Sequence, residues 1–277
     1  MKKTTKPKIY KYNDTVVFLK DLFNFLKAKE NKSLRDFADE LKIATGLMPM
    51  ILSRKRNLTN KLLKKIMKKF KYNKAEAGFA ENLRIIGFSQ KYEQRKKAIY
   101  QINKLKSYRE QNKSEFEIYK YLSHWYYVAI KEMSELSDFT EEPAWIQKRL
   151  AYAVSRKEIE AALVFLKRTK ILVYQKQRLV SSNKIMNCEE GIFKLTLGGF
   201  HKQILQLAGQ SIDEVDRDKR RILGQTLKVD KNQLAIIHAL LADTFEKIKA
   251  MTAQTNENED VYHIELVSIP LTKKEIK

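Results

Sequence analysis

The chain has 277 residues, of which 43% are hydrophobic, so it is long enough to bury one substantial core or two smaller ones. It has 55 Lys and Arg against 33 Asp and Glu, a net charge of +22, with one cysteine, 8 glycines and 4 prolines. A single cysteine excludes an internal disulfide, and the composition favours a mostly helical fold over disorder. No run reaches about 18 apolar residues, and no apolar segment follows the basic start, so we expect a cytoplasmic protein without a membrane span.

The positive charge is concentrated in the first 110 residues. This segment has 29 basic and 10 acidic residues, a net of +19, whereas residues 111–277 have 26 and 23, a net of +3. Such an imbalance attracts polyanions, of which nucleic acid is the commonest. An anionic membrane surface stays open as an alternative partner, because basic amphipathic helices also bind lipid.

Five short helices are predicted in the first 88 residues. The segments that contain them are 14–31, 33–41, 41–59, 60–71 and 74–86. Asp14 and Ser33 are expected as N-caps, with Asp36 at the capping-box position after Ser33. The fifth helix is expected to end near Gly87, in a C-cap region. The second and third helices are joined by a tight turn, so we predict a compact helix-turn-helix domain over residues 10–88.

A second three-helix unit is predicted after a basic segment over residues 89–112, which is expected to be a helical connector or a loosely packed helix. Its expected helices are a long one from Ser114, one over 143–150 that begins with a proline, and one over 155–170 with a serine N-cap. Two strand-like runs at 171–175 and 178–183 are so close that only a hairpin fits. Three helices followed by a hairpin predict a winged-helix-like unit over 113–184.

The sequence of residues 185–277 predicts an α+β unit. This unit is expected to dimerise or to sense a signal. Helices are expected over 200–208 and 232–253, and strands near 222–229 and 261–269. The predicted fold class is therefore mostly α, with a five-helix helix-turn-helix domain followed by a winged-helix-like and α+β C-terminal domain.

Residues 33–70, SLRDFADELKIATGLMPMILSRKRNLTNKLLKKIMKKF, resemble the phage-repressor (Cro-type) helix-turn-helix. This domain, joined to a longer segment containing YLSHWYYVAIKEM, FHKQILQLA and SIPLT, is similar to a large, mostly uncharacterised family of paralogous bacterial proteins. The resemblance covers nearly the whole chain. It implies a transcriptional regulator whose C-terminal domain has no assigned function.

The third helix has an unusual face for reading DNA. The positions that match the pattern's base-facing sites are Thr45, Gly46, Leu47 and Met50. Only Thr45 offers a hydrogen-bonding side chain, while Leu47 and Met50 could press against thymine methyl groups.

Three further positions depart from the pattern. Lys42 stands at the tight-turn position usually taken by glycine, Ala44 replaces the usual serine cap, and Pro49 lies within the helix. Pro49 costs little only if it falls in the first helical turn.

Polar and basic residues around this helix match the phosphate-binding half of the motif. The expected contacts are Ser33, Arg35, Arg54, Lys55, Arg56, Asn57, Lys64, Lys65 and Lys68. Such contacts supply affinity that falls steeply with salt, and little sequence preference. For any single lysine the alternative is a solvated helix face.

Signals for catalysis are missing from the sequence. The four histidines have no metal-ligand spacing, and there is no glycine-rich phosphate loop or zinc-type cysteine pair. Cys188 has no evident activating partner. The aromatic group of Tyr119, Tyr121 and residues 125–127 fits core or interdomain packing, with a ligand pocket or a base-stacking platform as alternatives. We therefore expect no catalytic residue, cofactor or metal.

The sequence predicts a DNA-binding transcriptional regulator that binds double-stranded DNA through its helix-turn-helix domain. A homodimer is expected, because one recognition helix reads only a half-site. The C-terminal domain would then dimerise, bind a protein partner or sense an effector. The alternative is a protein-interaction or scaffold module whose helix-turn-helix docks a partner through Leu47, Pro49 and Met50.

Overall fold

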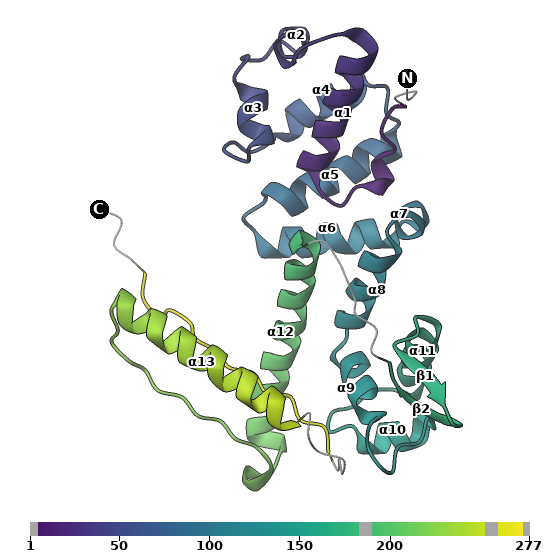
Figure 1. Ribbon diagram of the computed structural model, residues 1–277, viewed down its shortest axis with the longest axis vertical. Coiled ribbons are helices and arrows are strands. Elements are labelled where there is room, and N and C mark those ends of the chain that lie inside the picture. The colour runs from purple at the N-terminus through teal and green to yellow at the C-terminus, as the bar shows by residue number, and fades with distance from the viewer. Residues whose placement is uncertain (1–4, 183–189, 253–259, 274–277) are drawn as a thin grey trace. The chain divides into compact units, whose positions relative to one another are not determined.

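The computed structural model describes residues 5–182, 190–252 and 260–273 of the chain (Figure 1). Over these residues the protein is mostly helical, with two short strands. It divides into two units, residues 1–124 with 185–202, and residues 125–184 with 203–277. This division differs from the expected boundary at 89–112, because the first unit continues to His124.

The first unit contains a 3-10 helix, η1, and eight complete α-helices among the described residues. Their bounds are η1 Ile9–Lys11, α1 Thr15–Glu30, α2 Leu34–Glu40, α3 Leu47–Leu52, α4 Asn60–Lys69, α5 Lys74–Phe88, α6 Tyr92–Lys104, α7 Lys106–Gln111 and α8 Lys113–Leu122. α12, Glu190–Glu214, is shared between the units. Figure 1 shows α1–α5 as a cluster of short helices, which confirms five helices in this segment.

Side-chain caps set the start of these helices. Asp14 accepts hydrogen bonds from the amides of Val16 and Val17 at 2.7 and 3.0 Å, which confirms it as the α1 N-cap. The expected capping box of Ser33 and Asp36 is present at the start of α2. α5 ends at Phe88, one residue after Gly87, with Ser89 as its C-cap, which agrees with the expected end near Gly87.

Left-handed residues follow α1, α2, α3 and α4, and glycine takes none of these positions. Asn31, Lys42, Arg54 and Lys71 have φ values of 54°, 52°, 59° and 51°. A left-handed residue after a helix satisfies its last carbonyls and reverses the chain within a few residues. This explains how a glycine-poor sequence forms tightly connected short helices.

Residues 89–112, expected as a connector, are part of the hydrophobic core. Ala98, Ile99 and Ile102 of α6 and Tyr108 of α7 are buried in the same cluster as the apolar faces of α1 and α3–α5. The polar composition of this segment hides a narrow apolar stripe at helical spacing. The segment is therefore helical, as expected, and its two helices contribute side chains to the core.

The second unit begins with three helices and a hairpin. These are α9 Trp125–Met133, α10 Pro143–Arg149, α11 Arg156–Arg168, β1 Leu172–Gln175 and β2 Arg178–Ser181. β1 and β2 are antiparallel, with Leu172 opposite Ser181, and both residues of the turn have positive φ, 46° at Lys176 and 68° at Gln177. The expected hairpin and the capping box at Ser155 are confirmed. The single long helix expected from Ser114 is wrong, because it breaks between α8 and α9.

The aromatic residues of α9 pack inside the second unit. Tyr126 and Tyr127 are buried, and the rings of Tyr127 and Phe165 meet edge-on with centroids 5.3 Å apart. Burial raises the pKa of Tyr126 to about 12. Core packing of these two side chains is thus confirmed.

The C-terminal segment differs most from its prediction. α12 is longer than the helix expected over 200–208, and α13, Lys231–Thr252, matches the helix expected over 232–253. The strands expected over 222–229 and 261–269 are wrong, since both segments lack regular structure. Their residues favour strands, but within the described chain they have no strand to pair with. The α+β class is therefore corrected to mostly α for this segment.

No helix among the described residues is both long enough and apolar enough to cross a lipid bilayer. The described side chains also contain no group of three or more His, Cys, Asp or Glu that could hold a metal ion. Cys188 lies outside the described residues.

Candidate nucleic-acid interface

The candidate interface consists of α3, the loop from Ser53 to Thr59, and α4. Residues 41–75 contain 11 basic and no acidic residues. Most of these cations are exposed, because the apolar side chains between them are the ones that are buried. The segment is therefore the most strongly cationic part of the first unit.

Pro49 fits α3 because the helix begins late. Its first residue is Leu47 and its N-cap is Gly46, so Pro49 is the third helical residue. The amides of the first helical turn have no partner inside the helix, and a proline there removes no hydrogen bond. Met48 and Ile51 are fully buried and hold this six-residue helix against the core.

Three of the four predicted base-facing residues are exposed. Thr45 and Gly46 precede α3, and Met50, one turn after Gly46, is 41% exposed. Leu47 is half-buried and packs against the core. Thr45 is therefore the single exposed side chain of the four that can form a hydrogen bond.

The loop after α3 is fixed by one carbonyl group. The Met50 oxygen accepts hydrogen bonds from Ser53 Oγ at 3.2 Å, from the Lys55 amide at 2.8 Å and from the Arg56 amide at 3.2 Å. Leu58 is fully buried and anchors the other end. Lys55, Arg56 and Asn57 are exposed between these two anchors. The loop thus presents its cations from a fixed backbone.

Arg54 has a different partner. Its Nη2 atom lies 2.5 Å from Oδ2 of Asp14, the same carboxylate that caps α1. The ion pair connects the end of α3 to the start of α1. Arg54 was predicted to contact phosphate, and this geometry gives it a structural partner within the chain.

α4 separates apolar and basic side chains cleanly. Thr59 caps its N-terminus by accepting from the Leu62 amide at 3.2 Å, and its buried residues are Leu62, Leu63, Ile66 and Met67. Lys61, Lys64 and Lys68 are exposed, at spacings that place them along one side of the helix. Lys65 instead donates to the Leu41 carbonyl at 3.0 Å, at the end of α2.

A carboxylate of the chain itself, that of Asp36, occupies the start of α2. Oδ2 of Asp36 accepts from Ser33 Oγ at 2.7 Å and from the Ser33 amide at 2.8 Å. These hydrogen bonds hold the pKa of the Asp36 carboxyl below its usual value. A phosphate at this helix end would meet a carboxylate, so the geometry does not favour the predicted role of Ser33. The predicted neighbour Arg35 is exposed.

A small ion-pair network lies at the far end of α4. Glu40 pairs with both Lys32 and Lys69, and Lys32 also pairs with Glu30 at 2.7 Å. The hydrogen bonds from Lys32 and Lys69 lower the pKa of the Glu40 carboxyl. The charges of these two lysines are thereby balanced inside the protein.

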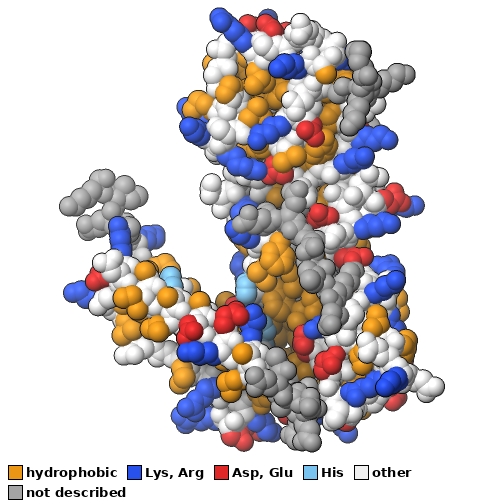
Figure 2. Space-filling view, in the orientation of Figure 1, with side chains coloured by type: hydrophobic (Ala, Val, Ile, Leu, Met, Phe, Trp, Pro, Cys, Tyr) orange, Lys and Arg blue, Asp and Glu red, His pale blue; other side chains and the backbone are white. Residues whose placement is uncertain are grey.

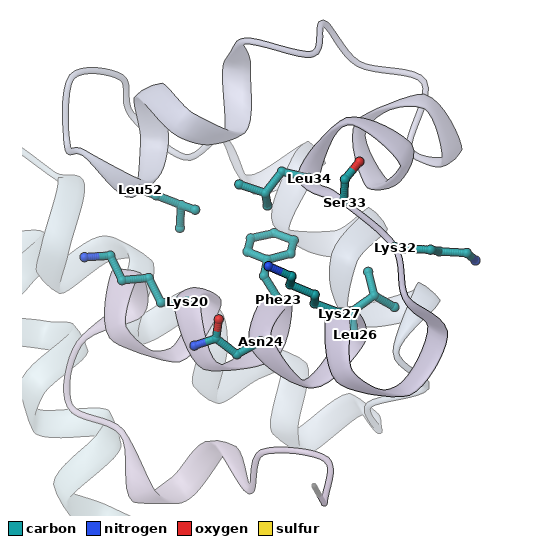
Figure 3. Close-up of a pocket in the computed structure, with 9 residues that line it drawn as sticks. All are labelled: Lys20, Phe23, Asn24, Leu26, Lys27, Lys32, Ser33, Leu34 and Leu52. Carbon is teal, nitrogen blue, oxygen red and sulfur yellow. The ribbon is translucent and has the colours of Figure 1, made fainter.

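Two open grooves border the interface. One, of about 500 Å³, has Phe23, Leu34 and Leu52 at its base and Lys20 and Lys27 at its rim (Figure 3). Neither lysine is among the contacts predicted from the sequence. Their seven-residue spacing on one helix was the signal available.

The second groove, of about 250 Å³, lies between α3 and α4. Its lining residues are Ile43, Leu47, Ile51, Asn57, Thr59, Lys61, Leu62 and Lys65. It therefore contains Leu47 of the predicted base-facing set together with two predicted cationic or polar contacts.

Comparison with known proteins assigns the larger part of the chain to a protein family. Residues 102–271 match the family described as a domain of unknown function, DUF4423. The match covers more than half of the 277 residues, so the chain belongs to this family. It begins within α6, so the candidate interface lies outside the matched residues. No curated protein and no solved structure matches the chain.

Proposed function

We propose that the chain binds duplex DNA through the loop after α3 and the exposed face of α4, and that it acts as a transcriptional regulator. One observation carries the proposal. Five exposed cations of this region, Lys55, Arg56, Lys61, Lys64 and Lys68, have no carboxylate within ion-pair distance among the described residues. Unpaired cations close together attract the closely spaced phosphates of DNA.

The order of the elements supports a helix-turn-helix interpretation of α2 and α3. Lys42 is left-handed at the turn, where the pattern usually has glycine. α3 would then be the helix that enters the major groove. With Thr45 and Met50 as its exposed side chains, direct base recognition would be limited, and the phosphate contacts would supply most of the affinity.

The proposed regulator acts in the cytoplasm. It acts as a homodimer, because two recognition helices that each bind one half-site recognise a DNA site better than a single helix does. The C-terminal domain would dimerise or respond to a protein or effector. The proposal assigns no catalytic residue, cofactor or metal to the chain.

A salt series of DNA-binding measurements tests the proposal. The triple variant Arg56→Ala, Lys64→Ala, Lys68→Ala removes three phosphate contacts, so the slope of log affinity against log salt should fall by about 3. At 0.15 M salt this corresponds to about a hundredfold weaker binding. Fluorescence anisotropy with unrelated duplexes measures both quantities.

A matched control is available at the start of α6. Lys91, Lys96 and Lys97 are also exposed, and replacing all three by Ala removes the same charge from the same unit. This control should keep the wild-type slope. Equal losses in both triple variants would mean that binding follows net charge alone, and the proposed interface would be wrong.

A second candidate function, docking of a protein partner, is favoured by the apolar residues of α3. Pro49 and Met50 are exposed, and Leu47 lines the groove between α3 and α4. Met50→Glu separates the two functions. A docking module would bind no DNA in its wild-type form, whereas a DNA-binding domain would lose affinity when a carboxylate faces the phosphates.

A further inference from the structure

The groove along α1 that Figure 3 shows, named here the α1 groove, has an apolar floor. Phe23 of α1, Leu34 of α2 and Leu52 of α3 form this floor, and the two leucine side chains extend toward the Phe23 ring. Both leucines are half-buried, so part of the floor is open to water. Figure 2 shows hydrophobic side chains between α1 and α3 of the first unit, bordered by Lys and Arg. Apolar side chains of a partner can fill such a floor.

The rim of the α1 groove is basic. Its nine lining residues all lie in the described chain, and among them are three lysines, Lys20, Lys27 and Lys32, and no acidic residue. Lys32 pairs with Glu30 and Glu40, so its charge is balanced within the protein. Lys20 and Lys27 are exposed and form no ion pair with a described carboxylate. The groove therefore has two unbalanced positive charges beside its apolar floor.

The spacing of these two charges matches a helix. Lys20 and Lys27 are seven residues apart on α1, two helical turns or about 10 Å, and Phe23 lies between them. A partner helix has the same repeat, so two of its carboxylates seven residues apart can meet both lysines. The apolar side chains between those carboxylates then face the floor.

Duplex DNA fits the α1 groove less well than a peptide does. Phosphates could meet Lys20 and Lys27, but DNA offers few apolar groups other than thymine methyls to cover the floor. The cations that carry the DNA-binding proposal are also separate from the groove, since none of the five lines it. The apolar floor and the basic rim together favour an acidic peptide with large apolar side chains.

We propose that the α1 groove binds an acidic amphipathic helix of a partner protein. Carboxylates of this helix pair with Lys20 and Lys27, and its apolar side chains pack against the floor. Leu52 is the last residue of α3, so the partner contacts the helix that is proposed to enter the major groove. The inference goes beyond the DNA-binding proposal and does not depend on it.

Peptide selection on the full chain tests the class of partner. A displayed library of random peptides of about 15 residues is enriched on the wild-type chain and depleted on the variant Lys20→Glu, Lys27→Glu, which keeps the cations of α4. Depletion removes peptides that bind elsewhere. The remaining peptides should have carboxylates about seven positions apart with large apolar residues between them. If no peptide remains, or if the remaining peptides are not acidic, the proposed class of partner is wrong.

Fluorescence anisotropy with one selected peptide tests the contacts. The variant Lys20→Glu, Lys27→Glu should raise the peptide Kd at least about tenfold, because two attractions become repulsions. A peptide with lysine in place of its glutamates should reverse this order and prefer the variant. Lys96→Glu with Lys97→Glu makes the same charge change at exposed positions of α6 and should keep the wild-type Kd. Equal losses in both variants would mean that net charge alone attracts the peptide, and the groove would be refuted.

DNA binding by the same two variants separates this inference from the DNA-binding proposal. Lys20→Glu with Lys27→Glu should change the salt slope of DNA binding no more than the α6 control does. A larger change would assign both lysines to the DNA-binding surface and overturn the peptide groove. A chain that binds the selected peptides through the groove but binds no DNA would retain this inference and refute the DNA-binding proposal.

Discussion

The region around α4 and the region around α11 are built alike but differ in charge. Each helix begins at a hydroxyl N-cap, Thr59 or Ser155, and each buries one apolar face. Residues 41–75 have 11 basic and no acidic residues, whereas residues 125–184 have 11 basic and 7 acidic residues. The packing pattern alone therefore does not distinguish a helix that binds a polyanion from a helix with a structural role.

The two regions differ in whether their cations have partners within the chain. In the second unit, Lys167 pairs with Glu141 at 2.8 Å, and Glu141 also accepts from the Tyr174 hydroxyl at 2.5 Å. Arg178 donates to the Leu136 carbonyl. These charges hold α11 and the hairpin in place. The exposed cations Lys55, Arg56, Lys61, Lys64 and Lys68 around α4 form no ion pair with a described carboxylate, so their charges face solvent.

The largest expected effect comes from removing one buried leucine in each region. Leu58 and Leu166 are both fully buried, so Leu58→Ala and Leu166→Ala should each lower the free energy of unfolding by about 2–5 kcal/mol. Leu58 anchors the cationic loop, so only its variant should also weaken DNA binding measured where both proteins are folded. Chemical denaturation and anisotropy report the two effects. Equal DNA binding by the two variants would show that the loop is not part of the interface.

Local signals in the sequence predicted local structure well. The caps at Asp14, Ser33 and Ser155 depend on residues within a few positions, and the structure has all three. The strands near 222–229 could not be judged in this way, because a strand also needs a partner that lies far away in the sequence. The role of Arg54 depended on Asp14, 40 residues earlier, and no local pattern indicates that pair.

The second expected effect is a contrast in DNA affinity. Lys148→Ala, Lys157→Ala and Arg168→Ala remove three exposed cations from α10 and α11, the same charge as the α4 triple variant. We expect less than about a twofold change in affinity, against about a hundredfold for the α4 set, because only phosphate contacts change the salt slope by about 1 each. A hundredfold loss here would move the DNA-binding surface to the second unit.

The third expected effect is a loss of stability when the N-cap of either helix is removed. Thr59→Ala and Ser155→Ala each remove an N-cap and should each cost about 1 kcal/mol of stability. The Ser155 hydroxyl also donates to Oε2 of Glu158 at 2.6 Å within its capping box, so Ser155→Ala removes a second hydrogen bond and should lose more. Thermal unfolding measures the losses. If Thr59→Ala cost more than Ser155→Ala, the helices would not be capped as the hydrogen bonds indicate.

The smallest expected effect concerns two carboxylates, Glu40 and Glu141, each paired with lysine. Hydrogen bonds from lysine lower the pKa of both carboxyls from 4.5, those of Lys32 and Lys69 for Glu40 and that of Lys167 for Glu141. A lowered folded-state pKa gives stability that is present above pH 4.5 and is lost as the pH falls through the folded value. Wild type should therefore exceed Glu40→Gln and Glu141→Gln in unfolding free energy at pH 7, and the differences should vanish in acid.

The same pair of variants distinguishes the two regions at pH 7. Glu40→Gln leaves Lys69 without its carboxylate beside the cationic surface, while Lys32 keeps Glu30, so DNA affinity should rise slightly and the salt slope should steepen. Glu141→Gln frees Lys167 in the second unit, and DNA binding should stay unchanged. Anisotropy across a salt series checks both. A rise in affinity for both variants would mean that total charge, rather than the position of unpaired cations around α4, determines binding.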